Sequence, residues 1–150
     1  MITFCLLRYN ALNIKNTHIY IYINMWATYD YTNFPTVYVT ISGSIESPRD
    51  FTHFIEQWLQ LFNNGSMFNL YFNTVNCGYI NIKYAILMAH KIRQFKKNKY
   101  TNLQFSKIEV ANKCILILLR LIFYIEAPIA PVEVYYEKNN IISSEHFYPH

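Results

Sequence analysis

The chain has 150 residues, a length that suits a single domain with its own apolar core. Hydrophobic residues make up 53% of it and charged residues only 15%, which excludes a disordered chain of low apolar content. With 3 Gly and 5 Pro, it is not a collagen-like or linker-type chain either. The formal net charge of +4 is mild and does not by itself indicate a nucleic-acid-binding protein.

The cysteine content and the apolar stretches indicate an intracellular, cytoplasmic protein. Three cysteines, at positions 5, 77 and 114, leave one thiol over and show no CxxC spacing. We expect neither a disulfide framework nor a zinc site, and we expect a reducing compartment. The N-terminus lacks the basic region and cleavage site of a signal peptide. The most apolar stretch, residues 113–126, is shorter than the roughly 20 residues that cross a bilayer, so no transmembrane segment is expected.

Asparagine, isoleucine, lysine and tyrosine are all frequent, and all four have A/T-rich codons. This bias indicates an AT-rich genome, such as that of a microbe, a protist or a large DNA virus. It also means that a single Asn or Tyr is weak evidence of function.

Alternation of β-branched or aromatic residues with polar ones predicts five strands: residues 17–24, 36–42, 66–73, 103–110 and 132–136. The first two are expected to pair antiparallel across a connection at residues 25–35. Pro131, at the entry to the last strand, favours an edge position for that strand. The tail from Glu137 onward is polar and is expected to be loose.

The first predicted helix begins at Ser47-Pro48-Arg49-Asp50, where Ser47 can cap, proline suits the first turn and the Asp50 carboxylate faces the positive helix end. Its apolar residues recur at helical spacing and predict one buried face: Phe51, Phe54, Ile55, Trp58, Leu59, Leu61 and Phe62. Asn63-Asn64-Gly65 is expected to end the helix.

Two further helices are predicted. One begins near Ile80 or Asn81, and the other follows a capping Asn112. The buried stripe of the former is expected to contain Ile82, Ala85, Ile86, Ala89, Ile92 and Phe95 or Lys96.

The alternation of strands and helices predicts an α/β fold. We expect a single-layer, mostly parallel mixed β-sheet with an opening hairpin and about three helices. Residues 1–33 would be an N-terminal segment that adds one strand, residues 34–136 the α/β domain, and residues 137–150 a polar tail.

Residues 34–136 resemble a STAS domain, the family named after sulfate transporters and anti-sigma factor antagonists. The family motif is an LxLDLSxVxxIDSSG-like run at a strand-to-helix turn, with two aspartates eight residues apart. This chain has LYFNTVNCGYINIKY there, with Asn73 and Asn81 at the acidic positions and Val75 and Ile80 at the apolar ones. The later strand LQFSKIEV and the helix KCILILLRLIF are similar to the final strand and the partner-facing helix of the family.

The chain departs from the family at the regulatory residues. The serine that is usually phosphorylated falls at Ile82, the next serine at Lys83 and the motif glycine at Tyr84. A phosphate at a helix N-terminus meets free backbone N–H groups and adds about two negative charges. Isoleucine cannot accept a phosphate, so the resemblance implies a retained scaffold whose phosphorylation switch has been lost.

Nothing in the sequence indicates an enzyme. Cys77 lies just before the second predicted helix, but the five histidines have no recognisable spacing to it. We therefore interpret Cys77 as a buried structural thiol, and Cys114 as a core residue of the third helix. The motifs HExxH, GxGxxG, GxxxxGKS/T and GxSxG are absent. No catalytic residue, cofactor or metal is expected.

A basic patch stands at the end of the second predicted helix. Its cations are Lys91, Arg93, Lys96, Lys97 and Lys99. As an alternative function, the patch would bind nucleic acid or an anionic membrane surface, with Phe95 and Tyr100 as stacking faces. A solvated helix end, where cations favour the negative end of the helix dipole, is the preferred interpretation.

The third predicted helix is apolar on nearly every face, because Arg120 is the one charged residue between Cys114 and Tyr124. Either the tail or the N-terminal segment covers this surface, or the surface is an interface with another chain. We predict a non-enzymatic module that binds a protein partner or a second copy of itself. Its candidate binding residues are Tyr79, Asn81, Ile82, Lys83, Ile117, Arg120 and Tyr124. A structural component of a larger assembly, such as a virus particle, is a further alternative.

Overall fold

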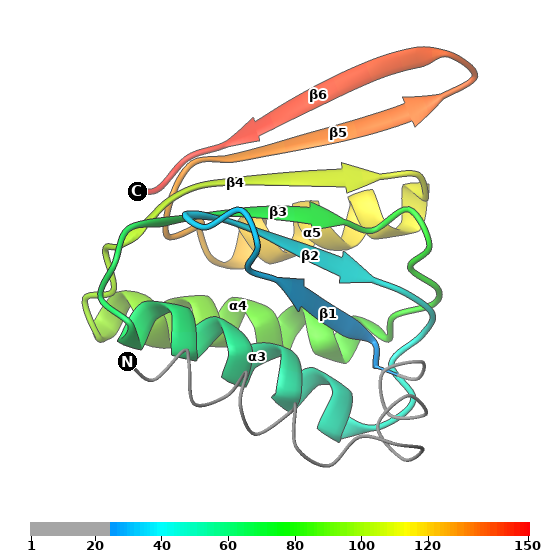
Figure 1. The fold of residues 1–150 in the computed structure, drawn as a ribbon. Coiled ribbons are helices and arrows are strands. Elements are labelled where there is room, and N and C mark those ends of the chain that lie inside the picture. Colours follow the sequence, from blue (N-terminus) through cyan, green and yellow to red (C-terminus); the bar gives the residue numbers. More distant parts are fainter. Residues whose placement is uncertain (1–24) are drawn as a thin grey trace.

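Each strand of the sheet lies beside the strand that comes next in the sequence. The computed structural model describes residues 25–150, which contain six strands and three helices (Figure 1). The sheet order is β1-β2-β3-β4-β5-β6. The strands are β1 (Ala27–Asp30), β2 (Thr36–Ile41), β3 (Phe68–Asn73), β4 (Leu103–Val110), β5 (Val132–Lys138) and β6 (Ile141–Phe147). The helices are α3 (Pro48–Asn63), α4 (Ile82–Lys97) and α5 (Lys113–Ile125).

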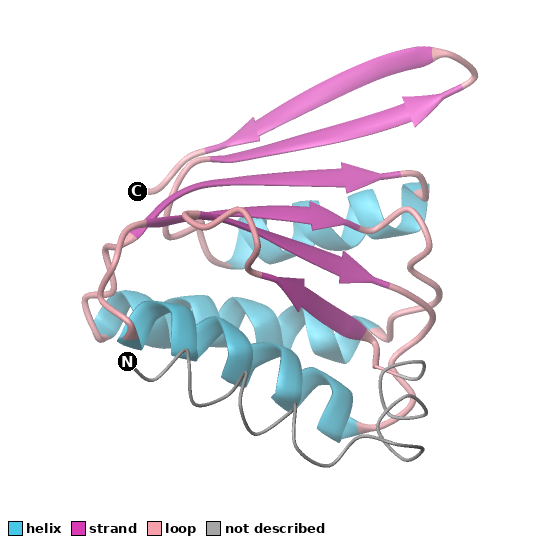
Figure 2. Cartoon of the chain, in the orientation of Figure 1, coloured by secondary structure: helices cyan, strands magenta, loops and turns pink. Residues whose placement is uncertain are grey.

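The middle of the sheet is parallel, and its two ends are antiparallel. Strands β2, β3, β4 and β5 are parallel and are joined by one helix each time, whereas β1 and β6 pair antiparallel with β2 and β5. Each crossover moves one strand further in the same direction, so crossovers of one hand place all three helices on one face of the sheet (Figure 2). The predicted α/β class, with a mostly parallel mixed sheet, an opening hairpin and three helices, is confirmed.

The core lies between the sheet and the helices. Alternate residues of the central strands point into it, and Val37, Leu70 and Val134 are almost completely buried. Helices α3 and α4 add an aromatic cluster, in which the rings of Trp58 on α3 and Phe95 on α4 lie 5.6 Å apart in an edge-to-face arrangement.

The starts of the helices were predicted well. At α3, the Asp50 carboxylate accepts hydrogen bonds from the backbone N–H groups of Ser47 (3.0 Å) and Glu46 (2.9 Å). The predicted apolar face of α3 is buried, except that Leu59 is half-buried. At α5, Asn112 caps the helix by accepting a hydrogen bond from the backbone N–H of Cys114 at 2.7 Å.

The connection predicted at residues 25–35 is wrong, because it contains β1. Within β1, Ala27 and Tyr29 face the helices and Thr28 and Asp30 face away. The Tyr29 hydroxyl donates to the backbone oxygen of Phe54 at 2.9 Å, which attaches the strand to α3. The predicted strand at residues 17–24 lies outside the described residues.

The loose tail and the edge position of the last predicted strand are also wrong. Strand β5 continues to Lys138, and β6 then pairs with it antiparallel over residues 141–147. The two strands are joined by Asn139 and Asn140, whose φ angles are 52° and 61°. Two successive residues with positive φ form the turn that suits the twist of a β-hairpin, and asparagine adopts this conformation more easily than most residues.

Candidate interaction site

Two loops meet where the parallel strands β2 and β3 end. The backbone N–H of Gly43 donates to the Asn76 oxygen at 2.9 Å, and the N–H of Gly78 donates to the Gly43 oxygen at 2.7 Å. Gly43 has a φ of 71°, in the left-handed region that favours glycine. The loop after β2 therefore supports the loop between β3 and α4.

Gly78 allows this close approach. A Cβ atom at this position would lie 2.5 Å from Ser44 Oγ and 3.1 Å from the carbonyl carbon of Gly43. Because the second contact is with backbone, a larger residue would push the two loops apart.

Asparagine side chains fix the path of the chain into α4. Asn73 Oδ1 accepts from the Val75 N–H at 3.0 Å, and Asn81 Oδ1 caps α4 by accepting from the Lys83 N–H at 3.0 Å. The buried Thr74 hydroxyl donates to the Glu109 backbone oxygen at 2.6 Å, which joins the turn to β4. The side chains of the two asparagines at the acidic positions of the STAS-like pattern thus accept hydrogen bonds from nearby backbone N–H groups.

The same turn exposes four large apolar side chains. The exposed fractions are 48% for Val75, 76% for Tyr79, 56% for Ile82 and 41% for Ile86. We call Val75, Tyr79, Ile82 and Ile86 the turn surface. The predicted burial of Ile82 and Ile86 in the helix stripe is wrong.

The rotation of α4 about its axis explains this exposure. Ala85, Ala89, Ile92 and Phe95 of the predicted stripe face the core, but Tyr84 joins them there in place of Ile82 and Ile86. The sequence periodicity fits both orientations, because Ala85, Ala89, Ile92 and Phe95 belong to both sets. Burial of the Tyr84 ring, 5.4 Å from Phe51, goes with the observed orientation.

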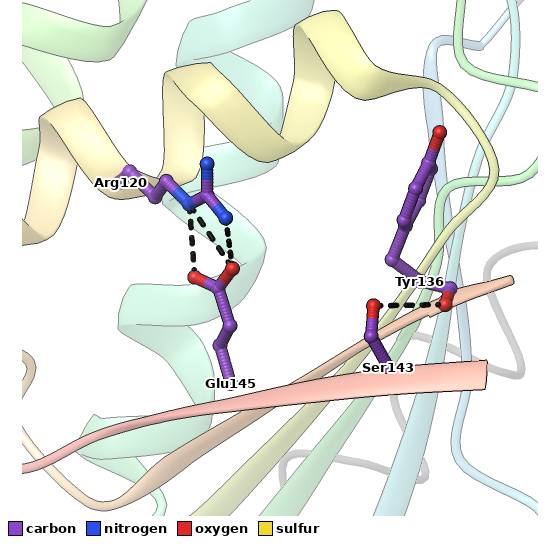
Figure 3. Close-up of polar contacts among 4 residues, drawn as sticks. All are labelled: Arg120, Tyr136, Ser143 and Glu145. Carbon is purple, nitrogen blue, oxygen red and sulfur yellow. Dashed lines mark hydrogen bonds and ion pairs between the residues drawn. The ribbon is translucent and has the colours of Figure 1, made fainter. Parts of the chain in front are cut away.

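The outer side of α5 is covered in part by the C-terminal hairpin. The Arg120 guanidinium donates to both carboxylate oxygens of Glu145 on β6, and Ser143 on the same strand donates to the Tyr136 backbone oxygen at 3.3 Å (Figure 3). The rings of Phe123 and Phe147 lie 4.7 Å apart. The sequence analysis left open whether the tail, the N-terminal segment or another chain covers this helix, and the tail covers part of it.

Ile117 and Tyr124 of α5 remain exposed. Cys114 is exposed as well, so its predicted place in the core is wrong, because Ile115 and Leu116 face inward from that turn of the helix. No hydrogen bond or ion pair among residues 25–150 joins the candidate residues of α5 to Tyr79, Asn81, Ile82 or Lys83.

The basic patch is partly neutralised. Glu126, just after α5, forms ion pairs with Arg93 at 2.7 Å and Lys96 at 2.9 Å. Lys91 donates to the side chain of Gln94 at 3.2 Å. Lys97 and Lys99 lie exposed at the helix end. The patch therefore joins α4 to α5 as well as facing solvent.

Glu126 makes the stability of the protein depend on pH. Hydrogen bonds from Arg93 and Lys96 lower the pKa of Glu126 below its usual value, against the opposing effect of burial. A lowered folded-state pKa gives stabilisation that is present above the unfolded pKa of about 4.3 and is lost as pH falls through the folded value. We expect Tm, measured from pH 7 down to pH 3, to fall less steeply below about pH 4.3 in Glu126→Gln than in the wild type. Equal slopes would show that the two ion pairs contribute nothing.

Cys77 has the properties of a structural thiol. It is buried, and burial raises the pKa of its thiol to about 11, although the neighbouring Trp26 lowers it in part. In residues 25–150, His, Cys, Asp and Glu side chains form no group of three that could hold a metal ion.

The sheet face opposite the helices carries a polar and aromatic cluster that the sequence analysis missed. The rings of Tyr38 and Tyr71 lie 5.2 Å apart, and Lys107 Nζ lies 4.1 Å from the ring centre of Tyr135. The Tyr71 hydroxyl donates to Glu109 Oε1 at 2.7 Å, and Tyr135 donates to Glu133. Their alternation with buried residues in four neighbouring strands, β2 to β5, is the sequence signal that would have placed them on one face.

Comparisons with known proteins do not place the chain in a family: no protein-family model matches its sequence, and no curated protein matches it. Within residues 25–150, none of the helices has the length and apolar character needed to cross a membrane.

Proposed function

We propose that this protein is a non-enzymatic protein-interaction module that binds a partner through the turn surface. The scaffold would be similar to a STAS domain in which the phosphorylation switch has been lost, since Ile82 stands at the position of the usual phosphoserine. The partner would be a protein with an apolar surface of its own, or a second copy of this chain.

The observation that supports this proposal is the exposure of the turn surface on a well-supported loop. Val75, Tyr79, Ile82 and Ile86 fall within twelve consecutive positions, 75–86, so their apolar side chains stand close together along the chain. Ile82 and Ile86 are four residues apart in α4 and so lie on the same face of that helix, and large apolar side chains gathered on a surface are typical of interaction sites. Tyrosine is enriched among the residues that dominate binding energy, which makes Tyr79 the expected anchor.

Rigidity favours binding at this turn. The hydrogen bonds between Gly43, Asn76 and Gly78, together with the Asn81 cap, hold the loop in one conformation before a partner arrives. A preorganised loop loses less conformational entropy when it binds.

The alternative of nucleic-acid or anionic-membrane binding has less support. Two of the five cations of the basic patch, Arg93 and Lys96, already form ion pairs with Glu126. The exposed sheet face carries Asp30, Glu109 and Glu133 beside Lys107, so it adds negative charge rather than a second basic surface. Membership of a larger assembly would use the same turn surface and is covered by the experiment below.

The test is Ile82→Asp in the full chain. Ile82 is the first residue of α4, where a carboxylate favours the positive end of the helix dipole, so we expect Tm to stay within a few degrees of the wild type. The buried charge should weaken the partner complex at least about tenfold, a loss of about 1.4 kcal/mol. A protein partner is detected by purifying the tagged protein from its own cells with low-salt and high-salt washes. Self-association is measured by sedimentation of the pure protein.

Ile142→Asp is the matched control, because Ile142 is similarly exposed but lies on β6. We expect this variant to keep the high-salt-resistant partner or the self-association. If Ile82→Asp retains its partner as well as Ile142→Asp does, the turn surface is not the binding site. Nucleic acid or lipid retained only at low salt would favour the basic patch instead.

A further inference from the structure

The exposed face of α4 is apolar where the helix begins and basic where it ends. Ile82, Ile86 and Leu87 are exposed in the first two turns, and we call them the apolar end. Arg93 and Lys97 are exposed in the last two turns, and we call them the basic end. Arg93 and Lys97 follow Ile82 by about three and about four helical turns, so all three side chains lie on the same face.

Nothing in α4 itself balances the charge of the basic end. The helix, IKYAILMAHKIRQFKK, contains five Lys or Arg residues and no Asp or Glu. Exposed helices usually carry both signs, because opposite charges four residues apart attract each other. Glu126 pairs with Arg93 and Lys96, but the other three cations form no ion pair with any residue from 25 to 150. Lys97 is therefore available to a carboxylate from outside the chain.

The charge of α4 does not suit a second copy of the chain. The formal net charge of the whole chain is already +4. In a symmetric dimer the same patch is used by both subunits, so two helices without any acidic residue would face each other. Like charges that are brought together across an interface oppose association.

Nucleic acid and membrane each suit only part of this face. Phosphate groups would neutralise the basic end but would leave Ile82 and Ile86 without an apolar contact. A helix that lies in a membrane surface buries one apolar face along its length and keeps its cations on the other. In α4 the apolar and basic side chains follow one another along a single face, so immersion of that face would also immerse Lys97.

We propose that the exposed face of α4 binds an acidic segment of a partner protein, with apolar side chains over the apolar end and carboxylates over the basic end. Along the helix axis, Lys97 lies about 16 Å from Ile86 and about 22 Å from Ile82. A partner helix would therefore carry its Asp or Glu residues about 11 to 15 positions from its apolar anchors, and an extended segment about 5 to 7 positions.

This inference rests on the proposed function, because Ile82 and Ile86 belong to the turn surface, and it adds the class of partner. The two ends have different effects on binding. Exposed charges mainly raise the rate of association, whereas most differences in affinity at one interface come from the rate of dissociation. We therefore expect the basic end to govern association and the apolar end to govern dissociation.

The test offers the full chain a library of random peptides displayed on phage, each as long as α4, 16 residues. We expect the enriched peptides to carry apolar residues at one end and an excess of Asp and Glu at the other. A synthetic copy of an enriched peptide should bind Lys97→Glu about fivefold more weakly than the wild type, through slower association. It should bind Ile82→Asp at least about tenfold more weakly, because the apolar anchor is lost.

Lys138→Glu is the matched control for Lys97→Glu. It makes the same change in net charge at an exposed residue, at the end of β5 instead of α4. We expect it to bind the peptide within about twofold of the wild type, so that a general effect of net charge is separated from an effect of the basic end.

The inference fails if no peptide is enriched, or if the enriched peptides have no excess of acidic residues. It also fails if Lys97→Glu binds the peptide as tightly as Lys138→Glu does. If Ile82→Asp still releases that peptide, the proposed function stands and only the acidic class of partner is wrong; a peptide that neither variant releases overturns both. Saturable binding of the wild type to phosphatidylserine vesicles or to single-stranded DNA, lost in Lys97→Glu, would assign the face to a membrane or to nucleic acid instead.

Discussion

Removal of residues 139–150 should lower the free energy of unfolding by about 3 kcal/mol or more and cause self-association. The truncated chain loses the whole of β6, which pairs with β5 along seven residues. It loses the contact between Phe147 and Phe123 and the ion pair between Glu145 and Arg120. The outer side of α5 and the edge of β5 are then uncovered together. An unprotected edge strand next to apolar surface is a template for pairing with another chain.

Urea unfolding followed by circular dichroism gives the stability of the truncated chain, and sedimentation velocity gives its oligomeric state. A chain shortened only by Pro149 and His150, which follow the hairpin, is the control and should behave as the wild type. If the chain that ends at Lys138 stays monomeric and unfolds at the same urea concentration as the wild type, the hairpin does not contribute to the stability of the fold.

Substitution of Gly78 by alanine should cost about 2 kcal/mol, as overpacking of a closely packed site does. The φ angle of Gly78 is not positive, so alanine can adopt its backbone conformation and the expected cost is steric alone. The new methyl group would meet Ser44 Oγ at 2.5 Å and the backbone of residues 43 and 44 at 3.1 to 3.2 Å. The loops must then separate, and the hydrogen bond from Gly78 to Gly43 lengthens.

The double variant Ser44→Ala with Gly78→Ala identifies which contact matters. It removes the side-chain clash and keeps the backbone clash, so we expect it to recover less than half of the lost stability. Chemical denaturation gives the free energies, and amide NMR shifts at residues 74–81 report displacement of the turn. Complete recovery in the double variant would mean that the two backbones do not limit the approach.

Much of the fold can be predicted from local sequence patterns, because these patterns do not depend on contacts between distant parts of the chain. The start of α3 is an example, because its serine, proline and aspartate each meet a requirement of the first turn. The alternation in β2 and β4 is another, since their helix-facing side chains are buried and the others are not. Such features depend on neighbours in the sequence, and the structure reproduces them.

The two ends of the sheet were mispredicted because their signals are weaker. Strand β1 has four residues, too few for periodicity to stand out, and its burial depends on the distant contact of Tyr29 with Phe54. Strand β6 is polar over most of its length, so hydrophobic alternation does not reveal it. Its one sequence signal is Asn139-Asn140, a pair that suits a hairpin turn and was read as part of a tail.

The position of the candidate residues in the fold was predicted in part. The sequence placed Tyr79, Ile82 and Lys83 at a strand-to-helix turn, and the structure has them there, between β3 and the first turn of α4. It did not reveal that Gly78 holds this turn against Gly43, because that contact joins loops far apart in the chain. The engagement of Arg120 by Glu145 was hidden for the same reason.

The strand order has a consequence for synthesis on the ribosome. Because each strand pairs with the one made just before it, the sheet can grow at one edge as the chain emerges, without waiting for a distant segment. The last strand differs from the others in one respect: α5 is synthesised before β6, the strand that covers part of it. Nascent chains that stall before residue 141 therefore present the apolar side of α5 to chaperones, and the emergence of β6 is the event that hides it.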